Sequence, residues 1–158
     1  MQTKQNSSPA IRAHPSWRIG IVFSSFYTEE VSALVDGAKA ALLRAGIAEQ
    51  NITEHAVAGS FEIPLIGSIL AHEKKVDALI GMGIIVEGET HHAELLARES
   101  ARGIMDVQVQ YGIPFAFEVL YVKNLSQAKA RSDGADNKGA EAAWAVLHSL
   151  ANIRKLRS

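Results

Sequence analysis

Apolar and polar residues alternate along this chain in segments that fit strands and helices in turn. Four segments rich in β-branched and aromatic residues predict strands. Between and after them, apolar residues recur at three- and four-residue spacing, as on one face of a helix. The predicted strands are residues 18–23, 52–57, 78–86 and 115–122, and the predicted helices are residues 28–45, 62–72, 91–111, 125–131 and 138–155.

Local signals place the ends and buried faces of these helices. Thr28 and Ser60 are expected to cap the first two helices, because their hydroxyls can accept hydrogen bonds from free backbone N–H groups. Gly46 is expected to end the first helix. Its predicted buried face is Val31, Leu34, Val35, Ala38 and Leu42. The predicted buried faces of the third and last helices are Ala93, Leu96, Ala97, Ala101 and Ile104, and Ala140, Ala143, Trp144, Leu147 and Ala151.

The order of the elements predicts a parallel sheet of four strands with helices on both faces, which is a three-layer α/β/α sandwich. Residues 78–86 are almost entirely apolar, as expected of a strand covered on both sides. Ligands of such sheets lie beyond the carboxyl ends of the strands. That rule selects four loops, which are residues 24–28, 58–62, 87–92 and 124–138.

Composition narrows the class of protein. The 158 residues fit one domain, predicted to be residues 18–158 after a flexible N-terminal segment, residues 1–17. A net charge of −1 argues against electrostatic binding to nucleic acid. The absence of cysteine excludes disulfides and thiolate catalysis. We see neither a secretory signal nor an apolar run long enough to cross a membrane, so a cytoplasmic location is expected.

The loop at residues 87–92 holds the first candidate chemistry. His92 begins a predicted helix, where its imidazole could transfer protons; the alternative is an ordinary surface histidine. Glu89 and Thr90 could offer backbone N–H groups and a hydroxyl to a phosphate, although plain helix capping uses the same donors. Arg131 and Lys138 are the nearest cations of the later loop. Together these residues favour chemistry on a phosphorylated small molecule.

Aromatic residues and a carboxylate mark the other loops. Phe61 and Glu62 lie at a strand-to-helix turn, where a ring could stack and a hydroxyl could be held. Phe26 and Phe117 could add further ring contacts, although phenylalanine is more often part of a core.

Other sites find little support. Adjacent residues on a helix point about 100° apart, so His91 and His92 cannot easily share a metal ion. Neither a complete dinucleotide fingerprint nor a Walker A motif occurs, so nucleotide binding is not predicted.

Three segments, taken in order, resemble the motifs of one enzyme family. They are residues 57–64 (Val-Ala-Gly-Ser-Phe-Glu-Ile-Pro), residues 88–92 (Gly-Glu-Thr-His-His) and residues 137–143 (Asn-Lys-Gly-Ala-Glu-Ala-Ala). The family is 6,7-dimethyl-8-ribityllumazine synthase, a transferase that acts in the penultimate step of riboflavin biosynthesis. The resemblance covers roughly residues 18–156.

The resemblance implies a flavodoxin-like fold and a condensation reaction. The family joins 5-amino-6-(D-ribitylamino)uracil to 3,4-dihydroxy-2-butanone 4-phosphate and releases phosphate and water. No cofactor or metal is implied, and the partners are the two substrates and further copies of the chain. Family members form pentamers with active sites between adjacent subunits, and some assemble twelve pentamers into an icosahedral shell.

The resemblance also assigns roles to residues of this chain. His92 is expected to transfer protons, and Glu89, Thr90 and Arg131 to bind phosphate. Phe117 is expected to reach the site of the neighbouring subunit. The full set of expected substrate-binding residues is Phe26, Ser60, Phe61, Glu62, Ile84, Ile85, Val86, Phe117, Lys138 and Glu141.

Some positions depart from the family pattern. Glu87 stands where arginine is common, next to the phosphate loop, and Glu118 stands where glycine is common. We expect activity to be retained, with weaker phosphate binding because of the extra carboxylate near the anion. Two alternatives therefore stay open beside the active synthase. One is a catalytically weak or inactive shell or scaffold protein that retains ligand binding, and the other is a flavin-binding protein of similar fold.

Overall fold

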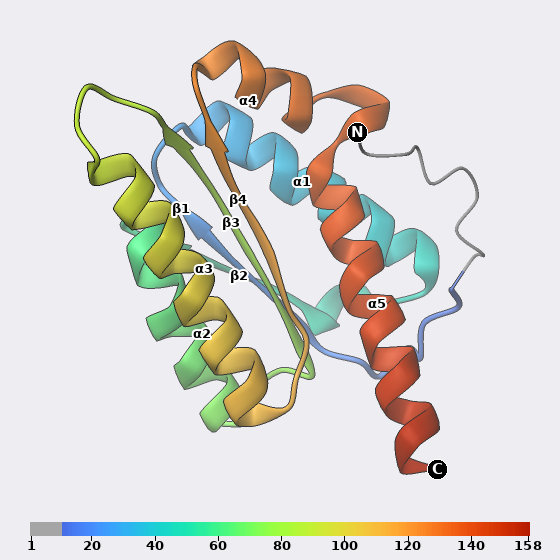
Figure 1. The fold of residues 1–158 in the computed structure, drawn as a ribbon. Coiled ribbons are helices and arrows are strands. Elements are labelled where there is room, and N and C mark those ends of the chain that lie inside the picture. The colour runs from blue at the N-terminus through green and yellow to red at the C-terminus, as the bar shows by residue number, and fades with distance from the viewer. Residues whose placement is uncertain (1–10) are drawn as a thin grey trace.

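A four-stranded, fully parallel sheet forms the centre of the molecule (Figure 1). The computed structural model describes residues 11–158. The strand order is β2-β1-β3-β4. The strands are β1 (Ile19–Ser24), β2 (Ile52–Val57), β3 (Ala78–Val86) and β4 (Phe115–Val122), which agrees with the four predicted segments. Every pair of neighbouring strands runs in the same direction, so all four carboxyl ends meet at one edge of the sheet.

Helices cover both faces of the sheet and complete the predicted three-layer sandwich. One face carries α1 (Thr28–Ala45) and α5 (Lys138–Arg157), and the other carries α2 (Ile63–His72) and α3 (His92–Tyr111) (Figure 1). The short helix α4 (Leu125–Ser132) packs against α1 and β4. Three 3₁₀ turns complete the described part of the chain: η1 (Glu49–Asn51), η2 (Ser60–Glu62) and η3 (Gly134–Asp136).

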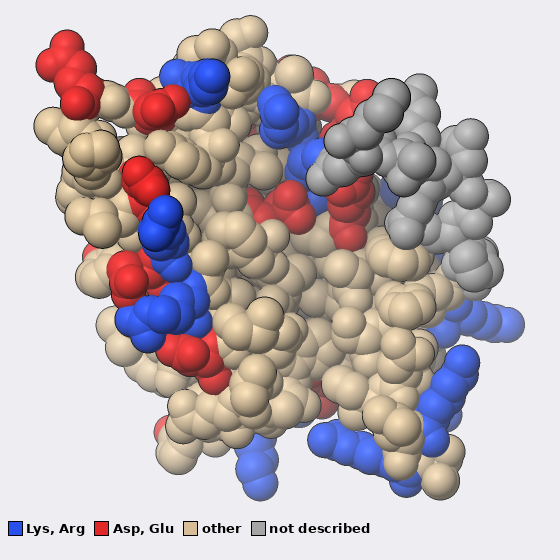
Figure 2. All heavy atoms as spheres, viewed as in Figure 1, with Lys and Arg blue, Asp and Glu red and all other residues tan. Residues whose placement is uncertain are grey.

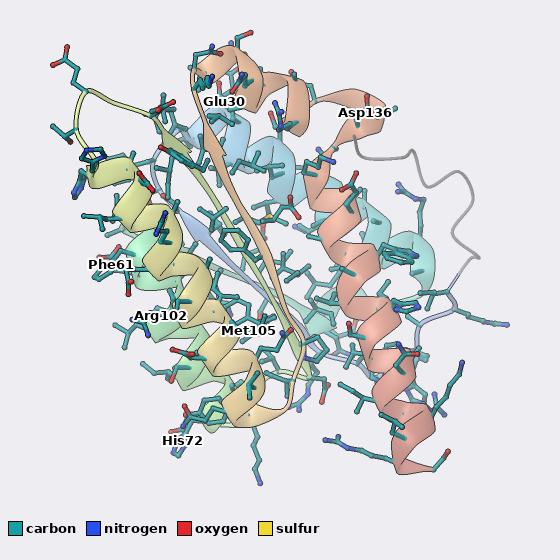
Figure 3. The ribbon with its side chains drawn as sticks, viewed as in Figure 1. Glu30, Phe61, His72, Arg102, Met105 and Asp136 are labelled. Carbon is teal, nitrogen blue, oxygen red and sulfur yellow. The ribbon has the colours of Figure 1, made fainter. Side chains whose placement is uncertain are left out.

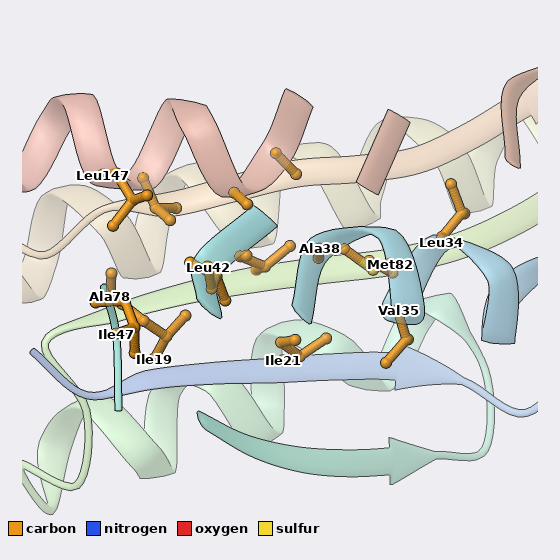
Figure 4. Close-up of a cluster of buried hydrophobic side chains, with 14 of the residues drawn as sticks. Ile19, Ile21, Leu34, Val35, Ala38, Leu42, Ile47, Ala78, Met82 and Leu147 are labelled. Carbon is orange, nitrogen blue, oxygen red and sulfur yellow. The ribbon is translucent and has the colours of Figure 1, made fainter. Parts of the chain in front are cut away.

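The strand β3 divides the interior into two apolar clusters. Its residues from Ala78 to Ile85 are all buried, as the nearly continuous apolar sequence predicts for a strand between two helix layers. Side chains alternate between the two faces along it. Ile80, Met82 and Ile84 pack with Leu34, Leu42 and Leu147 under α1 and α5, as Figure 4 shows in part. Leu79 and Ile85 pack on the α2 and α3 side.

The predicted helix caps need correction. Tyr27, in the left-handed region at φ 54°, precedes α1, and Thr28 is already the first helical residue. The Thr28 hydroxyl donates to the carbonyl oxygen of Ser25 at 3.3 Å and does not cap the helix. Ser60 opens the 3₁₀ turn η2 with its side chain buried, and α2 begins only at Ile63. In both loops tertiary packing, rather than a local capping bond, fixes how the helix begins.

The buried face of α5 is rotated by about one residue from the prediction. Ala143 and Leu147 are buried as expected, but Ala140, Trp144 and Ala151 are only half-buried. Their places in the core are taken by Gly139, Ala142, Val146 and Leu150. The rotation follows from close packing between α5 and α1, which requires the smallest residue, Gly139, at the contact with the Leu34 backbone. In α3, Ser100 and Val107 are similarly buried, whereas Ala101 is half-buried.

Asn137 fixes the beginning of α5. Its side-chain oxygen accepts hydrogen bonds from the backbone N–H groups of Gly139 at 2.8 Å and Ala140 at 3.3 Å. Its side-chain nitrogen donates to the carbonyl oxygens of Ala33 in α1 at 2.8 Å and Ser132 in α4 at 2.6 Å. One side chain therefore joins the start of α5, the end of α4 and the second turn of α1.

The segment before β1 packs against the domain where the structure describes it. Ala13 is buried, and its backbone N–H donates to the carbonyl oxygen of Ala45 at 2.9 Å. The remainder of the predicted flexible segment, residues 1–10, lies outside the described residues. Within residues 11–158, no helix is both long and apolar enough to cross a membrane.

Candidate active site

A cavity of about 500 Å³ opens at the carboxyl ends of β1, β2 and β3. This is the edge at which parallel sheets bind ligands, and three of the four predicted loops contribute to it. We call it the loop pocket. It is lined by Ser24, Phe26, Tyr27, Ala58, Gly59, Ser60, Phe61, Glu62, Ile84, Ile85, Val86, His92, Ala93 and Leu96.

The loop after β1 presents Phe26 at the mouth of the loop pocket. Its backbone N–H donates to the Ser24 hydroxyl at 3.2 Å, and the N–H of Ser25 donates to the carbonyl oxygen of Val57 at 2.9 Å. These bonds hold the loop, yet the Phe26 ring remains 63% exposed. Gly59 faces the ring, and a Cβ there would lie 3.5 Å from Phe26. An exposed ring on a fixed loop is available for stacking on a planar ligand.

The turn η2 places a hydroxyl, a ring and a carboxylate side by side. Ser60 is buried, and its hydroxyl lies where a Cβ on Gly83 of β3 would fall, so the glycine makes room for it. The backbone N–H of Glu62 donates to the carbonyl oxygen of Gly59 at 3.1 Å, which closes the turn. Phe61 is 59% exposed and lies beside α3 (Figure 3). A ligand in the loop pocket would meet hydrogen-bonding groups and an aromatic surface together.

The end of β3 forms the floor of the loop pocket. Ile84 and Ile85 are buried on opposite faces of the sheet, and Val86 is half-buried. Because successive side chains point to opposite faces, a ligand lying across this strand end meets its backbone groups as well as its side chains. Backbone N–H and C=O groups at such an edge can recognise a flat, polar ring.

His92 reaches the loop pocket from the first position of α3. Its backbone N–H lies 3.4 Å from the Thr90 hydroxyl, which orients the helix start. The adjacent His91 does not line the pocket; its side chain is 95% exposed, with Nδ1 3.8 Å from the Glu94 carboxylate. The structure thus separates the two histidines: His92 lines the loop pocket and His91 does not.

Other predicted site residues lie outside the loop pocket. Phe117 lies on the edge strand β4 and is 44% exposed. Arg131, at the end of α4, is exposed and donates to the carbonyl oxygen of Gln127 at 2.9 Å. Lys138 and Glu141 pair with each other on α5, and Glu89 and Thr90 lie in the exposed loop before α3. One chain therefore brings together Phe26, Ser60–Glu62, Ile84–Val86 and His92, but not the remaining predicted residues.

Several lining residues were not predicted. Four of them lie in loops that the sheet topology selects: Ser24, Tyr27, Ala58 and Gly59. Their closeness in sequence to Phe26 and Ser60 could have identified them as lining residues. Leu96 follows His92 by one helical turn, and this spacing could have placed both on one face of α3.

Charged side chains outside the pocket form a separate pattern. Along the outer face of α3, acidic and basic residues interleave, with Arg98 paired to Glu94 and Arg102 paired to Glu99 and Asp106 (Figure 2). Such exposed helical pairs contribute little to stability. No group of histidine and carboxylate side chains suited to a metal ion occurs within residues 11–158.

Comparison with known proteins gives a consistent result. The family model described as 6,7-dimethyl-8-ribityllumazine synthase matches residues 16–154. A protein from Methylobacillus flagellatus named 6,7-dimethyl-8-ribityllumazine synthase is 40% identical over 139 residues, which cover 88% of this chain and 91% of that relative. These matches extend over almost all of the described domain and confirm the resemblance seen in the three motifs.

Proposed function

The chain belongs to the 6,7-dimethyl-8-ribityllumazine synthase family, and we propose that the loop pocket is half of its active site. The enzyme condenses 5-amino-6-(D-ribitylamino)uracil with 3,4-dihydroxy-2-butanone 4-phosphate to give 6,7-dimethyl-8-ribityllumazine, phosphate and water. It is therefore a transferase of riboflavin biosynthesis, and we place its reaction in the cytoplasm.

One observation carries the assignment of the site. Three exposed aromatic rings, a buried hydroxyl, a carboxylate and a histidine, contributed by three separate loops, line one cavity of about 500 Å³. These are the groups that a flat pyrimidine with a polyol chain requires. In the proposed arrangement Phe26 stacks on the pyrimidine, and Ser60, Phe61 and Glu62 hold the ribityl chain. The backbone from Ile84 to Val86 meets the edge of the ring.

Proton transfer and positioning account for the chemistry. Imine formation, phosphate elimination and ring closure each move protons, and the His92 imidazole is the group of the loop pocket that we assign to carry them. The reaction needs no change of oxidation state, so these residues require no redox cofactor. Much of the acceleration would come from holding both substrates in contact, because a bimolecular step then becomes effectively unimolecular.

The remaining groups of the site are proposed to come from an adjacent subunit. Phe117, Lys138 and Glu141 lie outside the loop pocket of their own chain, and so does the phosphate-binding candidate Arg131. Arg131 and Phe117 are exposed, so a neighbouring copy could present them. Glu89 and Thr90 lie in the loop that leads to His92, and they would bind the phosphate together with Arg131. We propose a pentamer with one composite site at each interface, which could assemble further into an icosahedral shell.

The first test is turnover by the native protein. We expect lumazine absorbance and phosphate release to rise together and to saturate with both substrates, above the rate of the uncatalysed condensation. A buffer blank and heat-denatured protein supply that background. Family membership does not favour the scaffold alternative. A native rate equal to the background would contradict the proposal and would support that alternative.

A further inference from the structure

The first turn of α5 carries an ion pair whose two members differ in exposure. The ammonium nitrogen of Lys138 lies 2.8 and 3.0 Å from the two carboxylate oxygens of Glu141. The Lys138 side chain is 21% exposed and that of Glu141 is 63% exposed. The lysine is therefore largely enclosed by protein, where the charges around it are less screened than at an open surface.

Glu118 is a third ionisable group on this side of the sheet. Ala116, Leu120 and Val122, its even-numbered neighbours on β4, pack into the same cluster as Ala142 and Val146 of α5. Strand alternation therefore places the half-buried Glu118 on the α5 face, whereas Phe117 points to the other face.

Burial and the charges that face Glu118 together set the pH at which it ionises. The pKa of Glu118 is raised to about 7, chiefly by burial and further by the Glu141 carboxylate, while the Lys138 ammonium acts to lower it. Among the other elements packed against β4, α4 carries the exposed cations Lys129 and Arg131. A carboxyl that titrates near neutral pH changes the charge of the Lys138–Glu141 cluster within the range at which enzymes work.

We propose that Glu118 is a positioning residue that controls, through Lys138, how strongly the active site holds a phosphorylated substrate. This inference rests on the proposed function, in which Lys138 reaches the composite site from an adjacent subunit, as does Arg131, the proposed phosphate ligand. When Glu118 is protonated, one carboxylate and one ammonium balance each other. When it is ionised, two carboxylates compete for the same ammonium, the cluster becomes negative, and Lys138 is withheld from the phosphate.

The direction of the pH dependence follows. The ionised fraction of Glu118 grows as pH rises through about 7, so phosphate binding weakens in that interval. Replacement by glutamine keeps the size of the side chain and removes the ionisation. We measure the Kd for inorganic phosphate and the KM for the butanone phosphate at pH 6 and at pH 8.5. We expect the rise of each constant between these pH values to be about 3- to 10-fold larger in the native protein than in Glu118→Gln. The phosphate's own titration is common to both proteins and cancels.

Two further variants make the test specific. Glu73→Gln, an exposed carboxylate beyond the end of α2 on the opposite side of the sheet, should follow the native pH profile. In a Lys138→Met background, Glu118→Gln should no longer change the profile, because the effect passes through the ammonium.

Identical profiles for the native protein and Glu118→Gln would overturn the inference, as would a Glu118→Gln effect that survives in Lys138→Met. Phosphate binding is measured without turnover, so this result is separate from the test of the proposed function. A native protein that turns over but shows no dependence on Glu118 would retain the function and refute only this role.

Discussion

Replacing His92 with alanine is expected to lower kcat about 100-fold, since a positioned general acid or base typically contributes 10²- to 10⁴-fold. His92 is the only histidine among the residues that line the loop pocket. Its side chain is exposed at the surface of the first turn of α3, so its removal should leave folding intact. Steady-state rates of lumazine formation, corrected for the uncatalysed reaction, measure the effect.

The neighbouring histidine provides a matched control. His91→Ala removes the same functional group one residue away, from a side chain that is 95% exposed and outside the loop pocket. We expect its kcat to stay within about twofold of the native value, because loss of the exposed contact with Glu94 has little effect. Equal losses in both variants, or none in His92→Ala, would show that proton transfer is not the role of His92.

Replacing Gly139 with alanine is expected to reduce the free energy of unfolding by about 2 to 3 kcal/mol, as overpacking of a tight contact does. A Cβ at Gly139 would overlap the carbonyl group of Leu34 and come close to the Asn137 side chain. The backbone of α1 cannot turn aside as a flexible side chain can, so α1 and α5 must separate. Gly139 is the second residue of α5, so alanine gains less there than the roughly 1 kcal/mol it gains in a helix interior, and the loss should exceed that gain.

Gly88→Ala is the matched control for this substitution. No atom lies within 4 Å of the position that its Cβ would occupy, and the residue has no positive φ. We expect urea denaturation to give a native or slightly higher stability for this variant. A Gly139→Ala variant as stable as Gly88→Ala would contradict the close approach of α5 to the α1 backbone at this position.

The architecture was predictable because each element carries its own periodic signal. The apolar run of β3 and the helical spacing of α1 each point to one structure, and the alternating order of elements leaves a parallel sheet as the solution. Details that depend on tertiary contact were not predictable. Thr28 and Ser60 have the chemistry of helix caps, but the packing of their loops puts them to other uses. The rotation of α5 depends on a contact between Gly139 and a helix about one hundred residues earlier in the chain.

The candidate site was also only partly predictable from the sequence. Residues that follow strand ends, such as Phe26 and His92, could be located from the sheet topology alone. The positions of Phe117 and Arg131 relative to a ligand could not be predicted in this way, because one chain does not contain both halves of the proposed site. Glu118 was visible in the sequence as a departure from the family pattern. Its burial beside Lys138 and Glu141 emerged only from the packing of β4 against α5.

The most direct test of the account is complementation between two inactive variants. His92→Ala and Arg131→Ala are each expected to have little activity, because each removes a group from every composite site. Random 1:1 mixing of the two chains during refolding should leave about a quarter of the interfaces with both residues intact. The account therefore predicts recovery of about a quarter of native turnover in the mixed oligomer. If mixed oligomers, verified by native mass spectrometry of differently tagged chains, stayed at the average of the two parent variants, His92 and Arg131 would not meet across an interface.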